Sequence, residues 1–277
     1  MSILIFTLIL LLGAYFAGLI GSMTGLGGGV VIIPLLTLGF HIDIHYAIGA
    51  ALVASIATSS GSASAYVREG ITNMRLGMFL EIATTLGAVL GAAIAVYMPT
   101  NAIAIIFGIV LIFSAAMTLR KKHDQTVVVG SAASKRLKLN GSYPTVEGQK
   151  SYQLTNVSGG FSLMTLAGVL SGLLGIGSGA LKVLAMDVIM RVPFKVSTTT
   201  SNFMIGVTAA ASAVVYLQRG YIDPGIAFPV IVGVLGGATT GARLLQRMNV
   251  KVLRIIFSVA ISIVAINMMY NGFHHKF

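Results

Sequence analysis

The chain of 277 residues is 56% hydrophobic and only 9% charged, whereas soluble domains carry about 25% charged residues, so this composition indicates an integral membrane protein. The formal net charge of +11 does not indicate nucleic-acid binding, because the basic residues lie in the short links between apolar stretches. The absence of cysteine excludes disulfides, thiolate chemistry, iron–sulfur clusters and cysteine-bound zinc.

Ten apolar segments follow one another along the chain, in two sets of five. The first set covers residues 2–22, 28–40, 45–67, 75–97 and 101–119, and the second covers 158–174, 178–190, 196–218, 222–242 and 252–271. A helix needs about 20 apolar residues to cross the hydrocarbon core, so the second segment of each set is too short for an ordinary span. Segments one and two of each set therefore form either a re-entrant hairpin or two tilted, broken spans. The first segment has no basic residues before it, and we interpret it as a retained membrane segment and not a cleaved signal.

The two sets repeat the same glycines 150 positions apart. Each set has a glycine-rich loop between its first and second segments, and the loops end at Gly29 and Gly179. Further matches include Gly18 with Gly168, Tyr66 with Tyr216, Gly70 with Gly220, and Gly87, Gly91 and Ala92 with Gly237, Gly241 and Ala242. Duplicated halves, each with a glycine-interrupted apolar segment, are typical of secondary transporters, whose substrate site lies where the broken segments meet. We therefore expect an all-α, polytopic membrane protein with two inverted repeats of about four to five segments each.

The distribution of basic residues predicts how the repeats are oriented. If each repeat makes an odd number of crossings, 15 of the 18 Lys and Arg residues lie on one side, all except Lys182, Arg219 and Lys276. The positive-inside rule then places the central linker in the cytoplasm and both chain ends outside. The expected domains are a first transmembrane repeat (1–119), a cytoplasmic linker (120–157) and a second repeat (158–277). Within the linker, Asn140-Gly141 is a hairpin signal, and a flexible tether is the alternative.

The glycine-rich loops are the first candidates for a binding site. Glycine permits positive φ and lets bare backbone approach a ligand, and irregular backbone at membrane depth is tolerated only where it is buried in protein or lines a cavity. A helix beginning just after each loop would direct its free N–H groups at a small anion. The alternative, that glycines let helices pack closely, is favoured for Gly18, Gly87, Gly91 and their counterparts. The loop glycines expected at the site are Gly25, Gly27, Gly28, Gly29, Gly175, Gly177 and Gly179.

Three of the charged residues within the apolar segments are candidates for a function. Lys182 follows Gly179 by three residues, and because a lysine at the bilayer centre costs roughly 2.5–3.5 kcal/mol, a function is the default interpretation. It either neutralises an anionic substrate or pairs with a carboxylate; extension of its side chain to the interface is the alternative. Glu81 is a candidate proton relay for coupling, or else an interfacial acid paired with Arg75 or Arg68. Asp187, a second coupling candidate, lies about 140° around a helix from Lys182, so the two are not expected to pair.

A polar run begins the third segment of the second repeat, from Ser197 to Asn202. Hydroxyl and amide groups supply hydrogen-bond donors for oxyanions without a fixed charge, although hydroxyls also bond to carbonyls of their own helix. We expect Thr198, Ser201 and Asn202 to line the site. His41 and His45 have a spacing that can bind metal, but with Asp43 they lie in a loop without a further ligand, so solvated histidines are expected. No cofactor or metal is predicted.

These motifs resemble those of the sulfite exporter TauE/SafE family of membrane transporters, and the resemblance covers both halves. It depends on the two glycine loops, on Ala47-Ile-Gly49 and Ser197-Thr-Thr-Thr200, and on Gly-X3-Gly-Ala at 87–92 and 237–242. It implies transport of small sulfur-containing anions (sulfite, thiosulfate, sulfoacetate and related organosulfonates) across a bacterial or archaeal inner membrane. One departure is that Ala50 and Ala51 stand in the third segment of the first repeat, where the family commonly has Thr.

The sequence therefore predicts a secondary transporter that works by alternating access. An anion channel and a non-transporting subunit of a larger complex stay open as alternatives. A membrane enzyme is disfavoured, because no embedded His–carboxylate cluster and no nucleophile with a nearby base is found. The expected partners are a small anionic substrate and the lipid bilayer, with no nucleic acid, and association of identical copies is left open.

Overall fold

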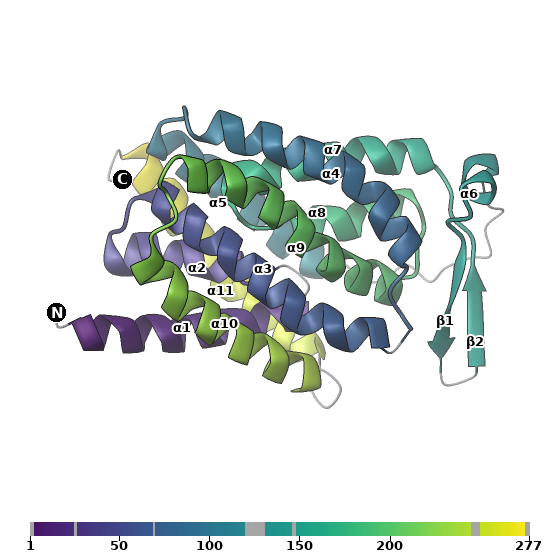
Figure 1. Ribbon diagram of the computed structural model, residues 1–277, viewed down its shortest axis with the longest axis horizontal. Coiled ribbons are helices and arrows are strands. Elements are labelled where there is room, and N and C mark those ends of the chain that lie inside the picture. Colours follow the sequence, from purple (N-terminus) through teal and green to yellow (C-terminus); the bar gives the residue numbers. More distant parts are fainter. Residues whose placement is uncertain are drawn as a thin grey trace.

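The computed structural model describes residues 3–24, 27–68, 70–119, 131–145, 148–244 and 250–274, which form a helical bundle with one small hairpin (Figure 1). The first half contains α1 (Ile3–Thr24), α2 (Gly29–Pro34), the π-helix η1 (Leu35–Gly39), α3 (Ile44–Arg68), α4 (Met74–Ala95) and α5 (Thr100–Leu119). The second half contains α7 (Val157–Leu174), α8 (Gly179–Leu184), the π-helix η2 (Ala185–Ile189), α9 (Phe194–Gln218), α10 (Pro224–Leu244) and α11 (Val250–Phe273). Six of the described helices are long and apolar enough to cross a membrane. The prediction of an all-α, polytopic membrane protein is confirmed.

The order of elements is the same in both halves. The short second segment of each half is an α-helix of six residues that continues as a π-helix of five. The two π-helices, at 35–39 and 185–189, lie 150 positions apart, as the glycines do. π-Helical turns are rare and occur frequently at functional sites, so their duplication marks the broken segments as the unusual part of each half.

The two halves interlock through their helices. α1 of the first half packs along α10 of the second, and α7 of the second half packs along α4 of the first. Glycines make the close approach possible: a Cβ on Gly18 would overlap the carbonyl of Val234, and one on Gly168 would overlap the carbonyl of Thr84. The interpretation of these glycines as helix-packing residues is therefore confirmed.

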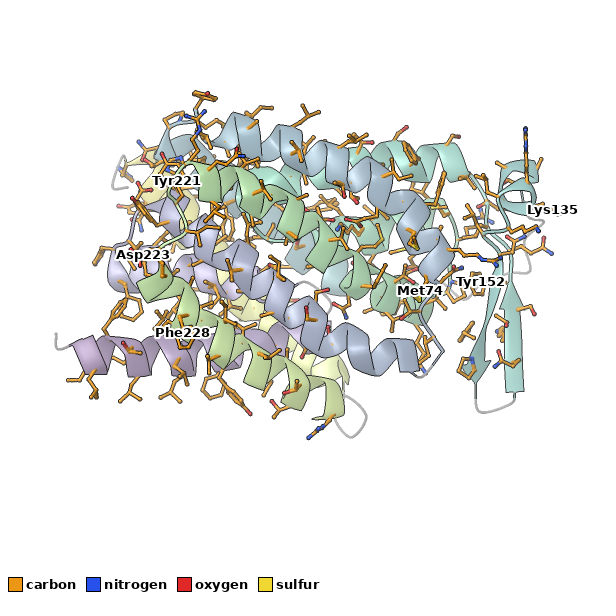
Figure 2. All side chains as sticks on the ribbon, in the orientation of Figure 1. Met74, Lys135, Tyr152, Tyr221, Asp223 and Phe228 are labelled. Carbon is orange, nitrogen blue, oxygen red and sulfur yellow. The ribbon has the colours of Figure 1, made fainter. Side chains whose placement is uncertain are left out.

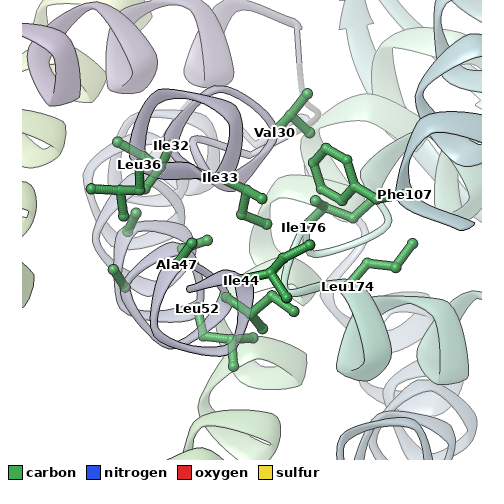
Figure 3. Close-up of a cluster of buried hydrophobic side chains, with 14 of the residues drawn as sticks. Val30, Ile32, Ile33, Leu36, Ile44, Ala47, Leu52, Phe107, Leu174 and Ile176 are labelled. Carbon is green, nitrogen blue, oxygen red and sulfur yellow. The ribbon is translucent and has the colours of Figure 1, made fainter. Parts of the chain in front are cut away.

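The outer surface is apolar and the interior holds polar groups. Along α4, Met78, Ile82, Leu86 and Leu90 form an exposed stripe at helical spacing. On the inside, Glu81, Lys182 and other polar side chains are buried. An apolar outer surface around buried charges is the reverse of the distribution in soluble proteins, where charged residues are almost never buried unless paired. The pattern fits a molecule that is surrounded by lipid. The largest apolar cluster joins both halves, with Ile33, Phe107 and Ile176 close together (Figure 3).

The chain ends and the linker lie at opposite ends of the bundle. Both termini are at the left in Figure 1, and the hairpin of β1 (Gly141–Thr145) and β2 (Gly148–Tyr152) is at the right, after the short helix α6 (Ala132–Arg136). Figure 2 shows Met74 beside Tyr152 at the hairpin end, whereas Tyr221 and Asp223 lie at the other end.

The predicted hairpin in the linker exists, but the position expected for its turn is wrong. Gly141 pairs with Tyr152 at the open end of the antiparallel ladder, and Thr145 pairs with Gly148 at the closed end. The Asn140 side chain instead accepts a hydrogen bond of 3.0 Å from the backbone N–H of Leu154. Asn73, which caps α4, holds the hairpin to the bundle through hydrogen bonds to the Leu139 carbonyl (2.9 Å) and the Tyr152 hydroxyl (2.8 Å).

Candidate functional site

The two glycine loops lie against each other between the halves. A Cβ on Gly29 would be 2.7 Å from the carbonyl oxygen of Gly175, and one on Gly27 would be 3.5 Å from that of Ile176. Gly27, Gly175 and Gly177 have φ values of 84°, 67° and 69°, which side chains rarely adopt. The broken segments therefore meet, as their duplication predicts. Gly25 lies outside the described residues.

Both short helices begin at the ends of these loops. α2 begins at Gly29 after Gly28, and α8 begins at Gly179 after Ser178, which has a left-handed conformation. Neither N-terminal cap makes a side-chain hydrogen bond. The Ser178 hydroxyl therefore does not cap the N-terminus of α8.

Buried hydrogen-bonding groups without partners surround the loops. The Ser55 Oγ, the Ser178 Oγ and the Asn202 Nδ2 have no hydrogen-bond partner among the described residues, although the three side chains are at most 4% exposed. Ser55 belongs to α3, and its Oγ would lie 3.0 Å from a Cβ on Gly29. Leaving a buried polar group unsatisfied costs about 1–3 kcal/mol. Such groups require an explanation, and a ligand with acceptor oxygens would supply one.

Asn202 is brought to this region by the packing of α3 against α9. The Ser59 hydroxyl, one turn after Ser55, donates a hydrogen bond of 2.5 Å to the backbone carbonyl of Asn202. One turn further along α9, the side chain of Ile205 lies next to Gly27 and Gly177. The Asn202 amide thus lies on the face of α9 that looks toward both loops.

The other two predicted polar residues have their hydroxyls engaged. The Thr198 hydroxyl donates to the Phe194 carbonyl of its own helix at 2.9 Å, which is the alternative interpretation for this run. The Ser201 hydroxyl donates to the carbonyl of Gly179 at 3.3 Å and so fastens α9 to the first residue of α8. Ser201 thus holds the second loop in place.

Lys182 is fully buried and is linked to a carboxylate through a threonine. Its Nζ donates to the Thr208 Oγ1 at 2.5 Å, and that hydroxyl donates to the Glu81 Oε1 at 2.6 Å. Thr85 adds a second hydrogen bond of 3.2 Å to the same Glu81 oxygen. Lys182 is 0% exposed, which is incompatible with extension to the membrane interface. Glu81 is buried as well, and the partners of its Oε1 are threonines and not an arginine.

Thr208 is a functional candidate that the sequence reading missed. The duplication held a signal, because Thr58 occupies the matching position in the first repeat. Thr58 lies beside the first glycine loop, where a Cβ on Gly28 would be 2.8 Å from its Oγ1.

The charged groups are not duplicated, since Ile32 and Ile231 stand at the positions that match Lys182 and Glu81. The arrangement around the loops is therefore asymmetric. Asp187, the other coupling candidate, lies half-buried in η2.

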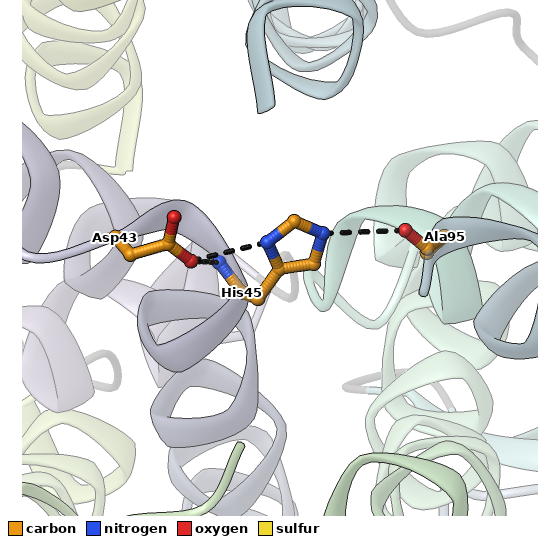
Figure 4. A network of polar contacts seen from close by, with 3 residues as sticks. All are labelled: Asp43, His45 and Ala95. Carbon is orange, nitrogen blue, oxygen red and sulfur yellow. Dashed lines mark hydrogen bonds and ion pairs between the residues drawn. The ribbon is translucent and has the colours of Figure 1, made fainter. Parts of the chain in front are cut away.

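The prediction of solvated loop histidines is wrong for His45, although His41 is exposed. The His45 Nδ1 is 3.0 Å from the Asp43 Oδ1, and its Nε2 is 3.3 Å from the Ala95 carbonyl oxygen (Figure 4). Its ring stacks on Tyr221 with centroids 5.1 Å apart. The hydrogen bond from His45 holds the pKa of Asp43 below its usual value. Packing between the two halves thus buries the His45 side chain, which was expected to be solvated in a loop.

A cavity of about 490 Å³ lies next to this histidine, at a different place from the glycine loops. It is lined by Thr37, Leu38, His41, Ile42, Asp43, Ile44, Asn267 and Asn271. None of the residues predicted for the substrate site is among them. The described residues include no group of three or more His, Cys, Asp or Glu side chains that could hold a metal ion.

Comparison with known proteins places both repeats in one family. The family model of the sulfite exporter TauE/SafE matches residues 10–268. Two probable membrane transporter proteins of Bacillus subtilis, YunE and YdhB, are 28% and 27% identical over 96% and 89% of this chain and cover 98% and 94% of their own lengths. A probable membrane transporter protein of Methanocaldococcus jannaschii is 24% identical over 96% of both chains. No solved structure matches significantly.

The family match and the spans together define the class of this protein. The match extends from α1 to α11, so it includes both glycine loops and the buried Lys182. The relatives are named probable membrane transporter proteins, and the expectation that the chain is not an enzyme is confirmed. The chain is thus a multi-pass membrane transporter protein that belongs to the sulfite exporter TauE/SafE family.

Proposed function

We propose that this protein is a secondary transporter of a small sulfur-containing anion, such as sulfite, thiosulfate, sulfoacetate or another organosulfonate. The observation that carries the proposal is a set of buried groups around the meeting point of the loops that have no partner among the described residues: the Ser55 and Ser178 hydroxyls and the Asn202 Nδ2. The name of the matching family suggests the sulfur chemistry of the substrate.

The proposed site combines neutral donors with one buried cation. Sulfite and sulfonates share a group with three acceptor oxygens, which the two hydroxyls and the amide can bind without a fixed charge. Lys182 lies in α8, one turn after the N-cap residue Ser178, and its backbone N–H donates to the Ser178 carbonyl at 3.0 Å. Its ammonium group supplies positive charge close to the anion. The glycine backbone of 27–29 and 175–179 allows the anion to approach the main chain.

Alternating access would operate around this fixed site. We propose that the repeats are inverted, that the linker is cytoplasmic, and that the protein resides in the inner membrane with both ends outside. In support, seven of the 18 Lys and Arg residues belong to the linker, and α7 begins beside the hairpin whereas α1 begins at the opposite end (Figure 1). Rocking of one helix group against the other would expose the loops to each side in turn.

Counterflow in proteoliposomes tests the proposal. Vesicles are loaded with unlabelled sulfite, thiosulfate or sulfoacetate, and uptake of the labelled anion is followed. We expect saturable uptake that is stimulated by internal substrate, which distinguishes a carrier from a channel. Lys182→Ala should abolish the uptake, whereas Lys195→Ala, which removes an exposed lysine of α9, should not. Absence of uptake for every sulfur anion would overturn the proposal.

A further inference from the structure

We propose that Lys182, Thr208 and Glu81 form the coupling device of the transporter, so that binding of the anion is accompanied by uptake of one proton on Glu81. The protein would then be an anion–proton symporter. This inference rests on the proposed function, because it requires an anion at the glycine loops.

The three side chains come from three elements that meet in the interior. Lys182 belongs to α8, Thr208 to α9 and Glu81 to α4, and the Thr208 hydroxyl accepts from the lysine while it donates to the carboxylate. Lys182 and Thr208 are 0% exposed and Glu81 is 7% exposed. A change at the lysine is therefore transmitted to the carboxylate through a single hydroxyl.

The charge balance of Lys182 and Glu81 links the binding of substrate to the binding of a proton. Without substrate, the Lys182 ammonium and the Glu81 carboxylate compensate each other through Thr208. An isolated buried charge is very costly, and an uncompensated partner of a buried pair destabilises strongly. An anion next to Lys182 adds further negative charge to the same interior. Protonation of Glu81 offsets one of the added negative charges, so anion and proton bind together and leave together.

The Glu81 carboxylate has an oxygen available for this proton. Its Oε1 accepts from Thr85 and Thr208, whereas its Oε2 is buried without a hydrogen-bond partner in the described part of the chain. The Oε2 can carry the proton while both threonine hydrogen bonds to Oε1 persist. Neutral Glu81 still accepts from Thr208, so the network is kept in both states.

In the described part of the chain, the elements that pack around this group carry few other ionisable residues. α7, which packs along α4, and α5, which contacts α8, contain no ionisable residue. α9 contributes Lys195 near its beginning and Tyr216 near its end, α4 contributes Arg75 near its beginning, and η2 contributes Asp187. Asp187 is the group that could replace Glu81 in this role, and the test includes it for that reason.

The test separates exchange from proton-driven accumulation. Proteoliposomes are held at zero membrane potential, and labelled sulfoacetate is offered either in counterflow at equal pH or with an acidic outside. Wild type should accumulate sulfoacetate only with the gradient. Glu81→Gln, which imitates the protonated side chain, should keep counterflow and lose the accumulation. Asp187→Asn, the matched control, should keep both.

A second measurement needs no variant. Sulfoacetate is added to the purified wild-type protein in weakly buffered solution, and the proton uptake is followed with a pH indicator; we expect uptake on binding. Binding without proton uptake overturns the proposal, and so does accumulation by Glu81→Gln that equals the wild type. Normal counterflow of wild type without gradient-driven accumulation refutes the coupling alone, whereas failure of counterflow refutes the proposed function.

Discussion

Gly29 of the first repeat lies directly against the Gly175 carbonyl of the second, close enough that a methyl group on Gly29 would be 2.7 Å from that oxygen. Both residues belong to the glycine-rich loops that precede the short membrane segments, and the contact is between backbones. The meeting of the two repeats at this point therefore leaves no room for a side chain.

This contact predicts that Gly29→Ala separates the loops. The added methyl would meet the Gly175 carbonyl and the Ser55 hydroxyl, so one of the loops must shift. We expect counterflow to fall strongly. Gly39→Ala is the control, because a methyl there meets only the end of the Leu35 side chain at 3.9 Å. Equal loss of transport in both variants would contradict a role for the contact itself.

Asn202→Leu tests the unpartnered amide. Leu52 occupies the matching position in the first repeat, so a leucine has a precedent in this environment. Since the buried Nδ2 makes no hydrogen bond among the described residues, its removal should leave the melting temperature of the substrate-free protein unchanged or higher. Affinity for the anion should fall. The two readouts are thermal unfolding in detergent and counterflow at several substrate concentrations; unchanged affinity would exclude Asn202 from the site.

Thr208 should contribute to stability as well as to coupling. Thr208→Val keeps the volume but removes the hydroxyl between Lys182 and Glu81, and loss of a partner from a buried polar group costs about 1–3 kcal/mol, with more for charged groups. We expect a clear decrease in the thermal unfolding temperature. Thr208→Ser retains the hydroxyl and should stay close to the wild type. Two equal melting temperatures for the valine and serine variants would refute the linkage.

Asp43 should make the stability of the folded protein depend on pH. Its hydrogen bonds from the His45 ring and backbone lower its pKa below the usual 3.8, so the folded state binds the proton less readily than the unfolded state. The stabilisation is complete above the unfolded pKa and is lost as the pH falls through the folded one. Melting temperatures measured at decreasing pH should therefore decline more for wild type than for Asp43→Asn. Parallel curves for the two proteins would show that this carboxylate does not contribute.

The sequence predicted the membrane segments well because their signal is local. Length and apolar composition determine whether a stretch can cross a bilayer, and the described helices follow the ten expected segments within a few residues at each end. The duplicated glycines located the two loops between the first and second segments, because the need for glycine is also a local property. Glycine is needed wherever backbones touch or φ is positive, and Gly29 and Gly175 satisfy these two conditions, respectively.

Only the tertiary structure decided which polar groups meet. Lys182 and Glu81 were recognisable singly as charges in apolar segments, but Thr208, which joins them, is 26 positions from one and 127 from the other. His45 was misjudged because the ring that covers it, Tyr221, belongs to the other repeat. Hydrophobicity and length are properties of each segment separately. The pairing of buried polar groups depends on how distant segments pack, and no single segment determines that packing.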